Sequence, residues 1–317
     1  MNNNTLCDNL TKKAEITPKN LPDGVWPVVL TPFHDDGKID WLGYEALLDW
    51  YQTHDCAGLF AVCLSSELYY LCKTEQLELA TRARKLLDIP VVAAGYLGES
   101  KAEKLDSIKQ MSDTGVDAVI IPICQIIPQD ADDVTLLAEI EDILQHTNGI
   151  DLGLYECPEP YHRLLSPEVL SVCAESGRFK FLKDTCCNSE TIKNKIAVCK
   201  DTPLKIFDAY IHNLLTTLKL GGAGFNGLAA SFFPEMLNKM VRCYADAPEK
   251  AVEIQSLVSV GQSVMSNKYP ACAKYFLNLR GVEIKPHCRN GCAELKEPDI
   301  AMLKALKTLV DSWNSNY

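Results

Sequence analysis

The sequence predicts an α/β protein, a closed (β/α)8 TIM barrel with a C-terminal helical extension. Eight short apolar or β-branched runs recur along the 317 residues, and their starts lie 19 to 34 residues apart. This spacing is the length of one strand plus one helix. The runs do not alternate strictly between apolar and polar residues, which is typical of parallel strands buried on both faces.

Eight segments are predicted to be strands. They are GVWPVVLTPF from Gly24, GLFAVCL from Gly58, PVVAAG from Pro90, AVIIPI from Ala118, LGLYEC from Leu152, FKFLKDT from Phe179, KIFDA from Lys205 and GFNGL from Gly224. A doubly wound open sheet is the main alternative. It normally has fewer units, and the residues after the first run (31–34, TPFH) lack the glycine pattern of a dinucleotide-binding turn.

Several of the intervening segments carry signals for the start of a helix. Ser100 and Glu103 form a capping box, in which each side chain can bond the other residue's backbone amide. Ser166 followed by Pro167 fits an N-cap with proline at the first helical position. Asp40 is a plausible cap for the first helix.

The strand signals stop after Phe233, and the remaining sequence is typical of helices. We therefore expect three parts: a polar N-terminal segment (1–23), the barrel (24–245) and a C-terminal helical extension (246–317).

Composition narrows the classes of partner. The formal charge of −11 argues against nucleic acid or an anionic membrane as a partner. The N-terminus has no apolar stretch resembling a signal peptide, and no window approaches the roughly 18 apolar residues of a membrane span. The 14 cysteines, in a chain without an export signal, are expected to be free thiols. These features predict a soluble, cytoplasmic protein.

In such barrels the reactive groups gather at the C-terminal ends of the strands. The polar residues at these predicted ends are Thr31, Ser65, Ser66, Glu67, Tyr155, Glu156, Lys183, Asp184, Asp208 and Asn226. Strand parity places Lys183 on the same face as two phenylalanines, and it can point Tyr155 into the barrel as well.

A lysine in the barrel interior has a lowered pKa, because burial disfavours the charged amine. The neutral amine can attack a ketone and form a Schiff base, and a nearby tyrosine such as Tyr155 can move protons. The alternative is a structural Lys183, whose stem packs while its amine reaches solvent or pairs with Asp184.

Tyr155 in LYECP and Lys183 in FLKD, together with TPFHDDGKID, LSSELYYL and LGGAGFNG in the same order, resemble the dihydrodipicolinate synthase/N-acetylneuraminate lyase family. The resemblance spans roughly residues 24–310. It implies a barrel enzyme that forms a Schiff base between Lys183 and pyruvate or another 2-keto acid. The reaction would be aldol cleavage, aldol addition or dehydration.

By this resemblance Tyr155 handles protons, and Ser65 and Ser66 hold the carboxylate of the keto acid. We also count Thr31, Asp208 and Asn226 as candidate substrate-binding residues, since Thr31 and Asp208 lie at strand ends and Asn226 needs a polar partner inside the barrel. No metal and no organic cofactor is expected, because the imine supplies the electron sink. The family implies a homo-oligomer, a tetramer or a dimer.

The sequence departs from the family at the proton relay. Leu64 stands where a hydroxyl residue is usual, and Ile123 and Cys124 stand where synthases carry a tyrosine that reaches the neighbouring subunit. Tyr69 or Tyr70 could substitute, or both could simply pack beside a helix start.

The residues that recognise the second substrate depart too. Pro160 occupies the position of the synthases' arginine, and Arg163 could stand in for it or form a surface salt bridge. Ile211 and His212 occupy the positions of the sialic acid lyases' acidic residues. We therefore expect a substrate other than those of the two namesake enzymes.

Two other classes remain open. The barrel could be a catalytically degenerate paralogue that binds a keto acid as a sensor, or, less well supported, a metal-dependent enzyme. The sequence HCRNGC at 287–292 lacks a second ligand pair for a zinc site, and Cys186-Cys187 is expected to be reduced.

Overall fold

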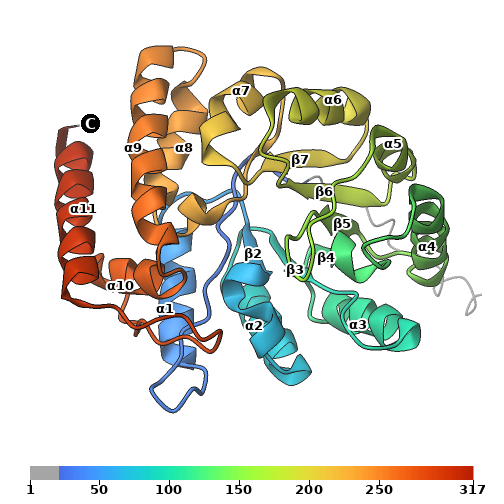
Figure 1. Ribbon diagram of the computed structural model, residues 1–317, viewed down its shortest axis with the longest axis horizontal. Helices are drawn as coiled ribbons and strands as arrows, with labels where there is room; N and C mark the ends of the chain where they lie inside the picture. Colours follow the sequence, from blue (N-terminus) through green and yellow to red (C-terminus); the bar gives the residue numbers. More distant parts are fainter. Residues whose placement is uncertain (1–20, 317) are drawn as a thin grey trace, which may run out of the picture.

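The computed structural model of the chain describes residues 21–316. Eight parallel strands form one sheet in the order β1-β8-β7-β6-β5-β4-β3-β2. The strands are β1 (Gly24–Val25), β2 (Leu59–Val62), β3 (Val91–Ala94), β4 (Ala118–Pro122), β5 (Leu152–Tyr155), β6 (Phe179–Asp184), β7 (Lys205–Asp208) and β8 (Gly224–Phe225). A parallel bridge between Val28 and Phe60 joins the two ends of the sheet. The predicted (β/α)8 barrel is therefore confirmed (Figure 1).

The first strand is much shorter than its apolar run suggests. The ladder from β1 to β8 covers only Gly24 and Val25. Pro27 has no amide hydrogen to donate, so the run continues as isolated contacts with β2: the Phe60 amide donates to the Pro27 carbonyl, and the Val29 amide donates to the Phe60 carbonyl. These contacts still close the barrel.

The helices alternate with the strands and cover the outside of the barrel (Figure 1). They are α1 (Trp41–Gln52), α2 (Lys73–Leu86), α3 (Lys101–Asp113), α4 (Asp133–His146), α5 (Pro167–Glu175), α6 (Ser189–Cys199), α7 (Leu214–Lys219) and α8 (Pro234–Cys243). The three predicted caps are confirmed: Asp40, Ser100 and Ser166 each accept a hydrogen bond from a backbone amide in the first turn.

Aromatic side chains fill the barrel interior below the site. Phe181 stacks on Phe207 with ring centroids 4.3 Å apart, and the edge of Trp26 packs against both rings. Phe60 contacts Phe181 and also Tyr155 one layer further along the axis. This apolar layer lies beneath the strand ends that carry the candidate site.

The C-terminal helices α9 (Pro248–Ser266), α10 (Ala271–Leu279) and α11 (Glu297–Asn316) form the predicted extension. Figure 1 shows them stacked beside α8 and α1, outside the ring. The predicted N-terminal segment falls outside the described residues except for 21–23, and the exact domain bounds stay a prediction. Within residues 21–316, no helix is both long enough and apolar enough to cross a bilayer.

Candidate active site

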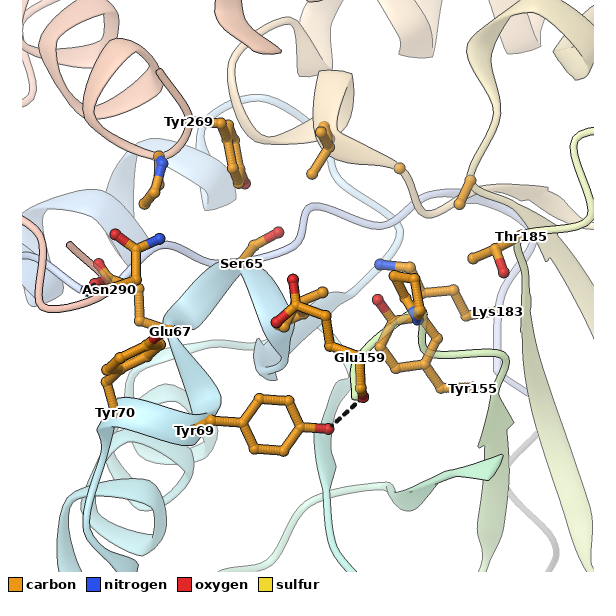
Figure 2. Close-up of a pocket in the computed structure, with 16 residues that line it drawn as sticks. Ser65, Glu67, Tyr69, Tyr70, Tyr155, Glu159, Lys183, Thr185, Tyr269 and Asn290 are labelled. Carbon is orange, nitrogen blue, oxygen red and sulfur yellow. Dashed lines mark hydrogen bonds between the residues drawn. The ribbon is translucent and has the colours of Figure 1, made fainter. Parts of the chain in front are cut away.

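A cavity of about 430 Å³ opens at the C-terminal ends of the strands. Its walls come from the loops after β2, β5, β6, β7 and β8 and from the C-terminal extension (Figure 2). The lining residues are Leu64, Ser65, Glu67, Tyr69, Tyr70, Tyr155, Pro158, Glu159, Lys183, Thr185, Ala209, Gly227, Leu228, Tyr269, Pro270 and Asn290.

Lys183 points into this cavity from β6, as strand parity predicts. Its side chain is 4% exposed, and its ammonium nitrogen Nζ lies 4.7 Å from the ring centroid of Tyr155 and 5.6 Å from that of Phe60. No carboxylate among the described residues pairs with it. Burial lowers the pKa of Lys183 below its usual 10.5. The amine therefore loses its proton more readily than an exposed lysine does.

Tyr155 stands opposite Lys183 in the ladder between β5 and β6, and Figure 2 shows the two side chains next to each other. Its ring is 3% exposed and packs edge-on against Phe60. Burial raises the pKa of the Tyr155 phenol well above 10. The hydroxyl is therefore protonated near neutral pH and can donate a proton or a hydrogen bond.

Asp184 follows Lys183 in the chain but is not its partner. Because side chains alternate along a strand, Asp184 points to the other face of β6, as Glu156 does at the end of β5. Both carboxylates bind Lys195 of α6, and the Lys195 Nζ lies 2.6 Å from Asp184 Oδ2. All three side chains are buried. The structural alternative, in which Lys183 pairs with Asp184, is therefore wrong.

The loop after β2 presents Ser65 to the cavity. Residues Leu64–Ser66 form one turn of 3-10 helix, and Glu67 follows with φ +62°. The Ser66 hydroxyl points away and binds the Val29 carbonyl at 2.6 Å. Of the two serines predicted to hold a carboxylate, only Ser65 lines the cavity.

Four other predicted binding residues also lie outside the cavity lining. Thr31 donates to the Ser66 carbonyl at 2.8 Å, and the Asn226 amide donates to the Trp26 carbonyl at 2.6 Å. These backbone carbonyls bind the Thr31 hydroxyl and the Asn226 NH2 group, whereas Asn226 Oδ1 has no hydrogen-bond partner among the described residues.

Asp208 and Arg163 are likewise engaged with neighbouring protein groups. Asp208 accepts hydrogen bonds from the Thr217 hydroxyl at 2.5 Å and the Tyr210 amide at 2.7 Å, and burial raises its pKa to about 7. Arg163 forms an ion pair with Asp133 at 2.6 Å. Of the two alternatives for Arg163, the structure shows the salt bridge.

Of the altered relay positions, Leu64 lines one wall of the cavity, whereas Ile123 and Cys124 are not among its lining residues. Tyr69 extends its hydroxyl along this wall and donates a hydrogen bond to the Glu159 carbonyl at 2.8 Å (Figure 2). The thiols of Cys124 and Cys157 bind the same carbonyl at 2.9 and 3.3 Å. The Glu159 carbonyl thus organises this wall.

The extension contributes three lining residues that the sequence prediction missed, Tyr269, Pro270 and Asn290. A buried ion pair of 2.7 Å between Glu67 and Lys274 of α10 fixes the extension to the loop after β2. Glu67 also accepts a hydrogen bond from the Asn290 amide at 2.9 Å. No periodicity or motif in the sequence links residues more than 200 positions apart.

Thirteen cysteines lie in residues 21–316, and all are free thiols, including Cys186 and Cys187. Among the described residues, no three histidine, cysteine or acidic side chains come together in a metal-binding arrangement.

The barrel and most of its extension match a protein-family model. The model of the dihydrodipicolinate synthetase family matches residues 21–309. The chain belongs to this family. Members of this family are lyases and aldolases. The family resemblance seen in the sequence is therefore confirmed, and the low sequence identity makes this chain a divergent member.

Individual relatives show how divergent this family member is. The chain is 26% identical over 274 residues to an uncharacterized DapA-like lyase of Thermococcus kodakarensis, covering 84% of this chain and 92% of the relative. It is 23% identical to the 4-hydroxy-tetrahydrodipicolinate synthase of Methanococcoides burtonii, covering 82% and 89%.

Solved structures of the same family share the fold. One is YagE, a prophage protein of E. coli K12 in complex with pyruvate, with a TM-score of 0.80 at 22% identity over 91% of this chain and 98% of that one. A monomeric dihydrodipicolinate synthase variant gives a TM-score of 0.82 at 19% identity over 92% and 97%. At these identities the likeness supports the fold alone.

Proposed function

We propose that this protein is a Schiff-base lyase or aldolase that acts on pyruvate or another 2-keto acid through Lys183. The observation that carries the proposal is the position of the amine: it lies in the cavity, against two aromatic rings, with its pKa lowered by burial. The neutral amine attacks the ketone carbon and forms a carbinolamine, which loses water to give an imine.

Tyr155 is the general acid in imine formation. Its phenol is protonated and lies beside the amine, so it can protonate the departing hydroxyl of the carbinolamine. The protonated imine then withdraws electrons from the adjacent carbon. This permits cleavage or formation of a carbon–carbon bond, or loss of a hydroxyl, without a metal or an organic cofactor. Ser65 holds the carboxylate end of the keto acid.

Reductive trapping tests this proposal. The protein is incubated with pyruvate, reduced with borohydride and digested, and the peptides are analysed by mass spectrometry. We expect the adduct on Lys183 and its loss in Lys183→Arg. Lys180→Arg is the matched control, because Lys180 lies on the same strand but donates to the Gly177 carbonyl. An adduct that persists in Lys183→Arg contradicts the assignment.

One observation supports a second function, binding of a keto acid without turnover. Leu64 puts an apolar side chain into the cavity where the family usually has a relay hydroxyl. A sensor of this kind forms the trapped adduct but releases no product. A screen of 2-keto acids and sugar-derived substrates for product formation separates the two functions.

The remaining features of the proposal follow from composition and family. The partner is a small keto acid rather than a nucleic acid or a membrane, in line with the net charge of −11. We propose a cytoplasmic location and a homo-oligomeric assembly, a tetramer or a dimer. Sedimentation measurements test the assembly, and fractionation of cells tests the location.

A further inference from the structure

Tyr269 brings a hydroxyl group from the C-terminal extension into the proposed active site. It lies between α9 and α10 and lines the same cavity as Lys183 and Ser65. Figure 2 shows the hydroxyl end of Tyr269 directed towards Ser65. The mechanism above assigns this residue no role.

The hydroxyl oxygen of Tyr269 is buried and has no hydrogen-bond partner among the described residues. The hydroxyls of Ser65 and Ser231 lie close enough to oppose part of the rise in the pKa of Tyr269, but neither forms a regular hydrogen bond with its oxygen. Ser231 donates its own proton to the Val28 carbonyl at 2.6 Å. Buried hydroxyls normally have a partner, so the lack of one here points to a missing ligand.

The protonation state of the Tyr269 hydroxyl indicates what kind of ligand group it can bind. Burial raises the pKa of Tyr269 well above 10, so the phenol stays protonated and acts as a hydrogen-bond donor rather than a base. With Ser65 it forms a pair of hydroxyl donors. Among the residues that line the cavity, Lys183 is the sole lysine or arginine. We therefore expect an anion near Ser65 to be bound by neutral hydrogen-bond donors such as the hydroxyls of Ser65 and Tyr269.

The position of Tyr269 is coupled to that of Ser65 through a buried ion pair. Glu67 lies two residues after Ser65, and Lys274 lies five residues after Tyr269. The Lys274–Glu67 pair, 2.7 Å long, holds the two segments together. The extension therefore delivers its hydroxyl at a fixed place in the site.

We infer that Tyr269 donates a hydrogen bond to the carboxylate of the 2-keto acid, next to Ser65, and so selects keto acids over simple ketones. This inference rests on the proposed function, because the carboxylate in question is that of the molecule bound to Lys183. It makes the C-terminal extension part of the substrate site rather than only a support of the barrel.

The test compares two carbonyl compounds, pyruvate and acetone, in the borohydride trapping assay. In Tyr269→Phe, we expect the pyruvate concentration for half-maximal trapping to rise about tenfold, the usual effect of losing one hydrogen bond to a charged group. Trapping of acetone, which has no carboxylate, should stay unchanged. Tyr275→Phe is the matched control on α10 and should trap both compounds as the wild type does.

The outcomes separate the inference from the proposed function. If the wild type forms no adduct on Lys183 with any keto acid, the proposed function fails and the inference fails with it. If the wild type traps pyruvate and Tyr269→Phe traps it equally well, only the inference fails. If Tyr269→Phe weakens the trapping of pyruvate and acetone equally, the inference is also overturned, because the substitution would then act on the Lys183 amine rather than on the carboxylate.

Melting temperature gives a second readout that is independent of trapping. The phenol has no hydrogen-bond partner within residues 21–316, so Tyr269→Phe should melt at the temperature of the wild type or above it. A clear drop would show a structural hydrogen bond and would overturn the inference. Ser65→Ala should raise the half-maximal pyruvate concentration in the same direction.

Discussion

Replacing Lys195 with methionine tests how the buried charges behind the site stabilise the barrel. Lys195 binds Glu156 and Asp184, and the change leaves both carboxylates buried without a cation. Removing one partner of a buried ion pair costs about 3–5 kcal/mol of unfolding free energy. For a chain of this size, that loss lowers the melting temperature by roughly 5–8 °C.

The destabilisation should depend on pH in a defined direction. Burial already raises the pKa of Glu156 from 4.5 to about 7, and the loss of Lys195 should raise it further. A carboxyl whose pKa is higher in the folded state favours folding most when it is protonated. In Lys195→Met, the contribution of Glu156 to stability should therefore be fully present below pH 4.5 and be lost as pH rises through 7 and above. The deficit relative to the wild type should be smaller at pH 5 than at pH 8.

Thermal unfolding followed by circular dichroism at pH 5 and pH 8 measures both effects. Lys193→Met is the matched control, since Lys193 lies on the same helix but forms an exposed pair with Glu190, worth at most about 1 kcal/mol. Adding Glu156→Gln to Lys195→Met removes one uncompensated charge and should restore part of the loss. If Lys195→Met melts like Lys193→Met at both pH values, the argument is refuted.

Three further predictions concern the site and its supports. The initial rate of pyruvate trapping should fall as Lys183 becomes protonated, with an inflection below pH 10.5 because burial lowers its pKa; an inflection at 10.5 or above contradicts the buried amine. Arg163→Ala should leave half-maximal pyruvate trapping within about twofold, because its guanidinium binds Asp133 away from the cavity; a tenfold change would place it in the binding site. Glu67→Gln leaves Lys274 buried without a carboxylate and should lower the unfolding free energy by about 3–5 kcal/mol. Glu75→Gln, at the more exposed pair with Arg289, should cost less, and equal melting temperatures would contradict the reasoning.

The sequence predicted the features of the fold that depend on neighbouring residues. Strand spacing and helix caps are local, so eight strands and the caps at Asp40, Ser100 and Ser166 could be identified without a structure, although the short lengths of β1 and β8 could not. Strand parity also placed Lys183 in the barrel interior, because a strand has a fixed period of two.

Partners that depend on tertiary contacts could not be predicted. The backbone carbonyls that bind Thr31 and Asn226 have no sequence signature, so both residues resembled substrate ligands. Tyr269 was missed because its place in the cavity depends on how the extension packs against the loop after β2. A tyrosine before a proline indicates only the start of a helix.

The alternation of side chains along β6 accounts for the reactivity expected of Lys183. A carboxylate within about 4–6 Å of the amine would favour the charged form and raise its pKa. Asp184 is adjacent in the chain, but it lies on the opposite face of the strand and is neutralised by Lys195. Glu156 is held in the same way beside Tyr155. The strand ends thus carry two acids directed outward and an amine and a phenol directed inward. Lys195 therefore helps to keep the amine apart from negative charge, and Lys183 can remain a nucleophile only while that separation holds.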